Sequence, residues 1–164
     1  ASDVYKRQGL AIVKGIHSRY DGKKHNPWNE IECGDHYARA MASYGVLQAI
    51  QGYWYDGPKG IIGFDPKIEK NNITGFFHAA EGWGNISQTR KDSKQTNSIE
   101  VKYGRLYLDK FQVVLPDRMN IQNIKAFLNG KAISTNVVKT EDYTEISLNG
   151  LQMRLGDKLQ VVFE

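Results

Sequence analysis

The segment from Asn26 to Ser43, NPWNEIECGDHYARAMAS, concentrates ionisable and aromatic side chains in front of a helix. It contains two glutamates, an aspartate, a histidine, an arginine and a tryptophan around a Cys-Gly pair. A surface helix start rarely needs so many of these groups, whereas the wall of a polar ligand pocket does. Asp35 is a suitable N-cap for the helix, which small and apolar residues continue as far as Ile50. The segment therefore predicts a binding loop that leads into an amphipathic helix.

A first helix is predicted upstream of this loop. Apolar residues recur there at helical spacing before the turn signal Asp21-Gly22: Leu10, Ile12, Val13, Ile16 and Tyr20. The second helix is expected to end before Gly52, because aromatic residues and then the breaker Gly57-Pro58 follow. Two helices connected in this way form an αα-hairpin, which is the repeating unit of α/α barrels and solenoids.

The pattern changes after Pro58 from helical spacing to short alternating or β-rich runs. Glycine, proline and asparagine punctuate residues 58–74, which we interpret as a linker. About eight strand-like runs follow: 75–79, 83–88, 98–103, 106–115, 121–128, 132–139, 143–148 and 158–163. Asn129-Gly130 is a type I′ hairpin signal, and Asn149-Gly150 is a similar turn. Strands of this length and spacing predict an antiparallel β-sandwich.

The composition is that of an ordinary globular protein, with 40% apolar and 24% charged residues. No apolar run reaches the roughly 18 residues that a membrane-spanning helix needs, so we expect no membrane span. The net charge of +4 is spread along the chain, without the dense basic stripe of a nucleic-acid surface. One cysteine and four scattered histidines have no metal-ligand spacing, and neither GxGxxG nor a Walker loop occurs. We therefore expect a soluble protein with no nucleic-acid partner, no bound metal and no cofactor.

Glu30 and Arg39 are the strongest candidates for ligand contacts. They are nine residues apart, and a junction between loop and helix can bring them face to face. A carboxylate that accepts and a guanidinium that donates can together bind a sugar hydroxyl, through charge-assisted hydrogen bonds of about 1.5–3 kcal/mol each. By spacing alone, the pair also fits a structural ion pair that ties the loop to the helix. Trp28 adds a flat apolar face on which a pyranose ring can stack.

The neighbouring polar residues have structural as well as functional interpretations. Glu32 competes with Glu30 as the sugar-binding carboxylate, or it braces the helix start. His36 is a further candidate for the pocket, although a packed histidine behind the pocket explains it better. Asp35 is better explained as an ionised N-cap at the positive end of the helix dipole than as a proton donor. Cys33 fits a small buried thiol better than a nucleophile.

The phrases NPWNE, ECGDHYARAMAS and YDGP resemble the C-terminal signature of glycoside hydrolase family 116, the β-glucosidases that include non-lysosomal glucosylceramidases. The resemblance is strong over residues 16–68 and weaker afterwards, where the sequence AEGWG is similar to a motif in bacterial members of this family. It implies an (α/α)6 catalytic barrel, retaining hydrolysis and a β-glucoside substrate. It also implies that Glu30 and Arg39 hold the terminal hydroxymethyl group of glucose in the −1 subsite.

No segment matches either catalytic motif of that family, so the resemblance implies catalytic carboxylates in an upstream remainder of the same polypeptide. The first eight residues, ASDVYKRQ, resemble a translated adapter from a sequence assembly. We therefore expect a C-terminal fragment of a bacterial enzyme, inactive by itself and either cytoplasmic or secreted. The expected fold class is α+β: a C-terminal helical hairpin of the barrel in residues 9–57, the linker in 58–74 and the sandwich in 75–164.

A second hypothesis is a non-catalytic carbohydrate-binding or interaction module, in which the strands carry exposed aromatic residues such as Trp54 and Trp83. This hypothesis explains less well why the charged residues gather in the helical part. Trp83 lies between Gly82 and Gly84. For Trp83 we prefer a core position at a strand bend to an exposed sugar platform.

Overall fold

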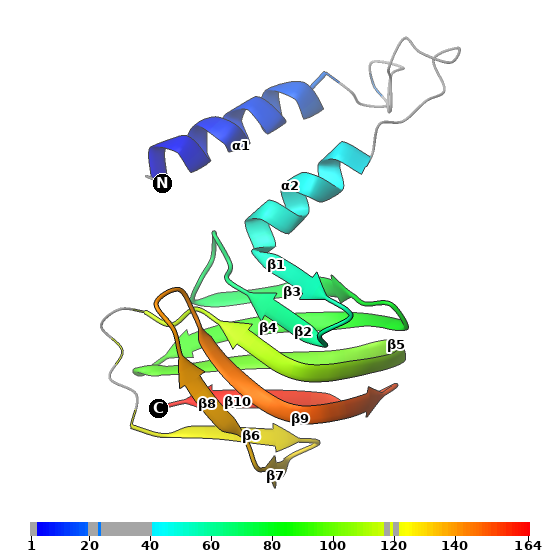
Figure 1. Cartoon of the computed structure of the whole chain (residues 1–164). Coiled ribbons are helices and arrows are strands. Elements are labelled where there is room, and N and C mark those ends of the chain that lie inside the picture. The colour runs from blue at the N-terminus through cyan, green and yellow to red at the C-terminus, as the bar shows by residue number, and fades with distance from the viewer. Residues whose placement is uncertain (1–2, 20–22, 24–40, 117–118, 120–121) are drawn as a thin grey trace. The chain divides into compact units, whose positions relative to one another are not determined.

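The computed structural model describes residues 3–19, 23, 41–116, 119 and 122–164 (Figure 1). The chain divides into two compact units, residues 1–46 and residues 47–164. Helix α1 (Asp3–His17) belongs to the first unit, and it begins within the eight residues that resemble an adapter. Helix α2 (Met41–Gln51) starts in the first unit and ends in the second. In the described ranges, neither helix has the length and apolar character that crossing a membrane requires. The boundaries expected at residues 57 and 74 stay predictions.

The expected helical hairpin of an (α/α)6 barrel, followed by an antiparallel β-sandwich, is wrong. In the described part of the chain only α1 and α2 are helices, no such hairpin is shown, and the strands form a mixed sheet. Helix α2 does end before Gly52, whose N–H donates to the Gln48 carbonyl at 2.9 Å. The residues after it form strand β1 (Tyr53–Asp56), because Tyr53 is buried and its neighbour Trp54 is exposed, the alternation of a strand.

Nine further strands follow β1 in the second unit. Their bounds are β2 (Ile61–Phe64), β3 (Asn72–His78), β4 (Gly82–Lys91), β5 (Lys94–Val113), β6 (Ile124–Leu128), β7 (Lys131–Ile133), β8 (Asn136–Lys139), β9 (Thr144–Arg154) and β10 (Lys158–Phe163).

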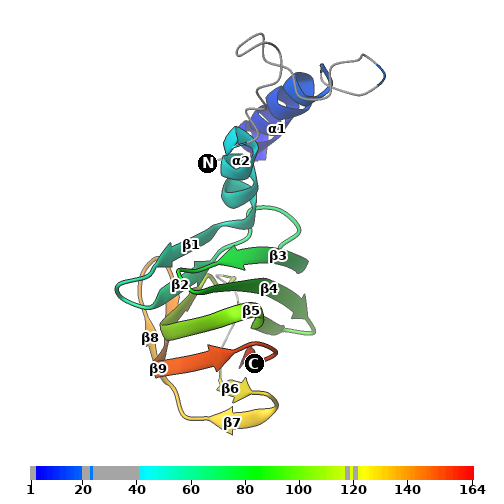
Figure 2. The same ribbon diagram turned by 90° about the vertical axis from the view of Figure 1, so that its right-hand side faces the viewer.

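The strands form two arms of one sheet, because the long strand β5 belongs to both (Figures 1 and 2). The first arm has the order β1-β2-β5-β9-β8, and the second has the order β3-β4-β5-β10-β6-β7. Every pair is antiparallel except β2 and β5, which run parallel and make the sheet mixed.

Strand β5 passes from one arm to the other at Gly104. Residues 94–104 pair with β4, and residues 105–113 pair with β9. Gly104 has a φ of 71°, in the left-handed region that favours glycine, and a Cβ there would lie 2.1 Å from the Glu81 carbonyl oxygen. A residue with a side chain at this position would therefore disturb the change of arm.

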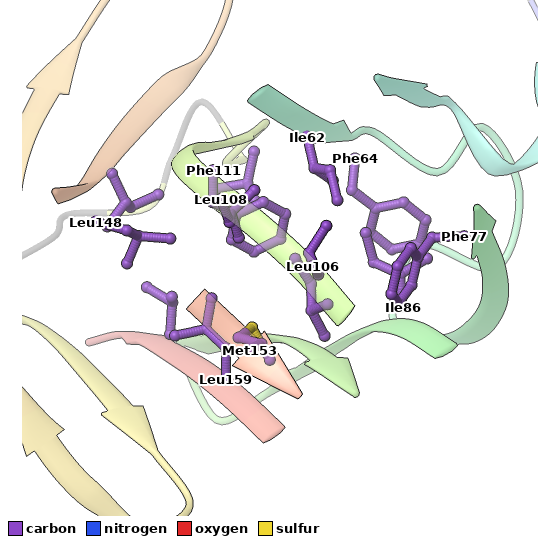
Figure 3. Close-up of a cluster of buried hydrophobic side chains, with 14 of the residues drawn as sticks. Ile62, Phe64, Phe77, Ile86, Leu106, Leu108, Phe111, Leu148, Met153 and Leu159 are labelled. Carbon is purple, nitrogen blue, oxygen red and sulfur yellow. The ribbon is translucent and has the colours of Figure 1, made fainter. Parts of the chain in front are cut away.

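One hydrophobic core contains side chains from both arms (Figure 3). Phe64 and Phe111 from the first arm are fully buried, as are Phe77 and Ile86 from the second. Because side chains alternate along a strand, the neighbours of these core residues face outward. The position of the core thus decides which residues form the outer face of each arm.

Candidate functional site

The residues predicted to bind sugar lie outside the described residues: Trp28, Glu30, Glu32, His36 and Arg39. Their contacts with one another stay a prediction. Within the ranges that the structure covers, no group of three or more His, Cys, Asp and Glu residues could hold a metal ion. The candidate site that can be built from coordinates lies on the sheet.

The indole of Trp54 lies flat on the outer face of the first arm. Trp54 in β1 pairs in register with Gly63 in β2. A Cβ on Gly63 would lie 1.7, 1.9 and 2.3 Å from the Cε2, Cζ2 and Cδ2 atoms of the indole. These three atoms are consecutive in the six-membered ring, and all three lie close to the same point above Gly63. One face of the ring therefore rests directly on Gly63. Trp54 is nevertheless 37% exposed, which leaves the opposite face to solvent.

A row of hydrogen-bonding side chains runs across the sheet beside this indole. Gly63 pairs with Gln112 in β5, and Gln112 pairs with Glu145 in β9. Trp54 Nε1–H donates to Gln112 Oε1 at 3.1 Å, and Gln112 Nε2–H donates to Glu145 Oε2 at 2.8 Å. The Lys110 ammonium lies 2.8 Å from Oε1 of Glu145. We call Trp54, Gln112, Glu145 and Lys110 the Trp54 row.

The carboxyl group of Glu145 is held in its ionised form. The hydrogen bond from Lys110 lowers the pKa of Glu145 most, the hydrogen bond from Gln112 lowers it further, and burial opposes both. The same contact with Glu145 raises the pKa of Lys110. A glycosidase acid needs a carboxyl group with a raised pKa, so Glu145 is suited to accept hydrogen bonds and unsuited to donate a proton.

The Trp54 row is chemically complementary to a pyranose. Such a ring has an apolar face of C–H groups and a rim of hydroxyls, which fits a flat indole with polar groups at its edge. Of the described contacts, Glu145 uses one hydrogen bond on each carboxylate oxygen, and the Lys110 ammonium uses one of its three donors. The remaining acceptor and donor positions can bind sugar hydroxyls.

A second exposed aromatic cluster lies on the outer face of the second arm. Trp83 and Tyr103 have ring centroids 5.8 Å apart and planes inclined by 18°. Phe76 lies 6.3 Å from Trp83 and 5.9 Å from His78. Near-parallel rings at this separation stack on one another. We call Phe76, His78, Trp83 and Tyr103 the Trp83 stack.

The Trp83 stack corrects one expectation from the sequence. We preferred a core position for Trp83, but its side chain is 46% exposed. Trp83 pairs in register with His78 and with Tyr103, at a point where a bulge shifts the register of β4 and β5. Tyr103 stacks against the Trp83 indole and Phe76 lies beside it, which suits packing of these rings on one another better than stacking on a sugar.

A hollow of about 490 Å³ lies at the β4–β5 hairpin of the second arm. Its lining residues are Asn71, Arg90, Lys91, Asp92, Ser93, Lys94, Pro116 and Met119. This lining mixes charges of both signs and contains no aromatic ring. The hollow shares no residue with the Trp54 row.

Sequence reasoning missed three of the four residues in the Trp54 row. From the sequence, Trp54 is only an exposed aromatic residue of the second hypothesis, and no pattern singles out Gln112, Glu145 or Lys110. The usable signal was Gly63, because a glycine inside a strand often marks the close approach of another group. That signal does not say which residue approaches.

Comparisons with known proteins give partial likenesses only. No protein-family model matches the chain, and no curated protein matches it. A GH127 β-L-arabinofuranosidase from Geobacillus stearothermophilus T6 is similar with a TM-score of 0.43 and 14% identity, over 77% of this chain and 18% of that one. A protein described as a glycoside hydrolase has a TM-score of 0.42 and 15% identity, over 68% of this chain and 17% of that one.

An α-L-rhamnosidase from Dictyoglumus thermophilum has a TM-score of 0.39 and 11% identity, over 70% of this chain and 12% of that one. This chain spans less than a fifth of each of the three proteins. It is thus similar to a portion of three proteins that are named as glycoside-cleaving enzymes. Family 116 is named for none of them, so the resemblance to that family stays a proposal.

Proposed function

We propose that this chain is the carbohydrate-binding part of a glycoside hydrolase that acts on β-glucosides. The observation that carries the proposal is the indole of Trp54, which lies flat on Gly63 with one face open to solvent. Glu145 and Lys110 stand at the end of the hydrogen-bonded row that begins at this indole. A sugar ring stacked on Trp54 brings its hydroxyl rim toward these charged groups.

The hydrolase part of the proposal comes from the segment 26–43. Its resemblance to family 116 supports a −1 subsite in which Glu30 and Arg39 bind the hydroxymethyl group of glucose. Trp28, Glu32 and His36 are further candidates for the same pocket. The catalytic carboxylates belong, in this proposal, to an upstream remainder of the polypeptide, and the chain of 164 residues alone is inactive.

The sheet surface is tested by titrating the full chain with cellobiose and following the binding by NMR. We expect Trp54→Ala to weaken binding about tenfold or more, because the buried apolar area and the stacking together contribute about 1–3 kcal/mol. The matched control is Trp83→Ala, which removes an indole of the second arm that is more exposed than that of Trp54. We expect that variant to change the affinity less than twofold.

Thermal unfolding of both variants shows whether each remains folded. Equal losses of affinity in Trp54→Ala and Trp83→Ala would contradict the proposed surface, as would a wild-type chain that does not bind cellobiose.

The −1 subsite is tested in the intact parent enzyme. Glu30→Ala or Arg39→Ala should lower kcat/KM by about 2–4 kcal/mol of transition-state stabilisation, because each change leaves the partner charge buried and unpaired. Glu141→Ala, an exposed glutamate beyond β8, is the control. A loss under threefold would speak against the sugar contact. Turnover of a β-glucoside by the 164-residue chain alone would refute the upstream position of the catalytic carboxylates.

The second candidate function is a non-catalytic carbohydrate-binding module. It is favoured by the position of the whole Trp54 row inside the second compact unit, residues 47–164. The two candidates differ in what Glu30 and Arg39 do. Unchanged hydrolysis in Glu30→Ala and Arg39→Ala, together with glycan binding that still depends on Trp54, would favour the module.

A further inference from the structure

We infer that the outer face of the first arm binds an extended β-1,4-linked oligosaccharide, with Tyr107 as a second stacking platform beside Trp54. This inference rests on the proposed carbohydrate-binding function of Trp54. It adds the class of ligand, an all-equatorial pyranose chain of at least three units, and a binding residue that the proposal does not include.

The ring of Tyr107 lies down on the sheet between two glycines. A Cβ on Gly60 would lie 2.6 Å from Cε1 and 2.9 Å from Cδ1 of Tyr107. A Cβ on Gly150 would lie 3.3 Å from both Cε2 and the hydroxyl oxygen, at the opposite edge of the ring. Because Gly60 directly precedes β2 and Gly150 lies in β9, the two edges rest over backbone on opposite sides of β5, and the plane of the ring follows the sheet. Tyr107 is 47% exposed, so its outward face is open.

A bulge places Tyr107 on the same face as the Trp54 row. In a regular strand Tyr107 and Gln112, five residues apart, would point to opposite faces. The register shifts between Leu108 and Lys110, so that Leu108 pairs with Leu151 and Lys110 pairs with Ser147. Leu108 and Phe111 are both fully buried although they are three residues apart, so the alternation of β5 reverses here and Tyr107 lies on the same face as Lys110 and Gln112.

The bulge is held by three hydrogen bonds. The N–H of Gly150 donates to Oδ1 of Asp109 at 2.9 Å, and the N–H groups of Asp109 and Lys110 donate to the Gly60 carbonyl at 2.8 and 3.1 Å. The two glycines that support the Tyr107 ring are therefore also the residues that fix the backbone beneath it. The orientation of the ring is built into the sheet.

The spacing of the two platforms fits alternate units of a sugar chain. Gly60 directly precedes β2 and Gly63 lies within it, so three residues separate the two supports by at most about 10 Å. A 1,4-linked pyranose unit advances a chain by about 5 Å, since it spans a ring and one glycosidic linkage made of bonds near 1.5 Å long. In this inference Trp54 and Tyr107 therefore hold units i and i+2.

The linkage follows from the faces that these units present. In a β-1,4-linked chain of all-equatorial pyranoses each unit is turned by half a revolution relative to the next. Units i and i+2 then offer the same face to a flat surface, as two platforms in one sheet face require. The unit between them passes over the region of Lys110 and Glu145, whose charged groups can bind its hydroxyls. An α-1,4-linked chain coils and does not keep alternate rings in one plane.

The experiment is a calorimetric titration of the full chain with cellobiose, cellotriose, cellotetraose, cellohexaose and maltohexaose. We expect the affinity to rise about tenfold from cellobiose to cellotriose, which reaches both platforms, and then to level off, with much weaker binding of maltohexaose. Tyr107→Ala should remove the rise with chain length, whereas Tyr107→Phe should keep it because the ring remains. Tyr103→Ala, which removes an exposed tyrosine of the Trp83 stack, is the control and should bind as the wild type does.

The outcomes separate this inference from the proposed function. Equal affinity of the wild type for cellobiose and cellohexaose, or a chain-length rise that survives in Tyr107→Ala, would overturn the inference. Cellobiose binding that still depends on Trp54 would in that case leave the proposed function standing. If Trp54→Ala binds every oligosaccharide as the wild type does, the proposed function fails and the inference fails with it. Maltohexaose binding equal to that of cellohexaose would overturn the assigned linkage.

Discussion

The two exposed aromatic regions of this sheet differ in the surface that each ring turns to solvent. Trp54 and Trp83 both expose a large part of the indole. Trp54 has Gly63 opposite it in register and lies flat on it, whereas Trp83 has Tyr103 opposite it and stacks against that ring. Exposed area therefore does not identify a ligand surface by itself. The size of the cross-strand neighbour decides whether a ring face is open or covered.

The largest expected effect comes from filling the space under Trp54. In Gly63→Val the new Cβ would lie 1.7 Å from Cε2 of the indole, so the ring must leave its place. The φ of Gly63 is outside the left-handed region, so the backbone accepts valine. We expect cellobiose binding to weaken about tenfold, as in Trp54→Ala, with a change in tryptophan fluorescence measured in the same titration.

Asn85→Val is the matched control for this prediction, because it adds a valine to the exposed face of the second arm, opposite Phe76 in register. We expect that variant to bind normally. Wild-type affinity in Gly63→Val would show that the flat ring is not what binds the sugar, and would remove the difference between the two regions.

A smaller effect should distinguish the two regions by their stability. A double-mutant cycle of Trp83→Ala and Tyr103→Ala should give a coupling of about 0.5–1.5 kcal/mol, because stacked aromatic pairs interact by that amount. The same cycle for Trp54→Ala and Tyr107→Ala should be additive within about 0.5 kcal/mol, since those rings are well separated. Urea unfolding measures all the variants. Equal coupling energies in the two cycles would contradict the proposed difference between the two regions.

The smallest effect concerns the charges of the Trp54 row. Because the folded-state pKa of Glu145 lies below its ordinary value of 4.5, the pair with Lys110 stabilises the fold above that pH. This contribution is lost as the pH falls through the lowered pKa and Glu145 takes up a proton. The stability difference between wild type and Glu145→Gln, measured by chemical unfolding, should therefore be smaller at pH 3 than at pH 7. If the difference in unfolding free energy were the same at pH 3 and pH 7, the ion pair between Lys110 and Glu145 would contribute nothing to stability.

Local patterns predicted several elements because their causes are local. The last predicted run, 158–163, coincides with β10, and the predicted hairpin turn at Asn129-Gly130 has positive φ at both residues, 52° and 78°. Asn149-Gly150 has the same signature, yet it lies inside β9 opposite the bulge of β5. The same two residues thus form a turn or a bulge according to the strands that surround them.

The predicted runs 98–103 and 106–115 fall on the single strand β5, apart from residues 114 and 115. Gly104 lies between the two runs, and it marks the change from one arm to the other. Whether a glycine ends a strand or lets it change partners depends on strands β4 and β9. No periodicity within β5 contains that information.

The amino-acid sequence determined the alternation of buried and exposed residues along each strand and the position at which helix α2 ends. It also predicted a sugar-binding pair, Glu30 and Arg39, from residues close together in the chain. Only the tertiary structure decided that Trp54 meets Gln112, 58 residues away, and that Gln112 meets Glu145, 33 residues further on. The physical reason is that side-chain periodicity is a property of one strand, whereas the register between distant strands is set by packing of the shared core.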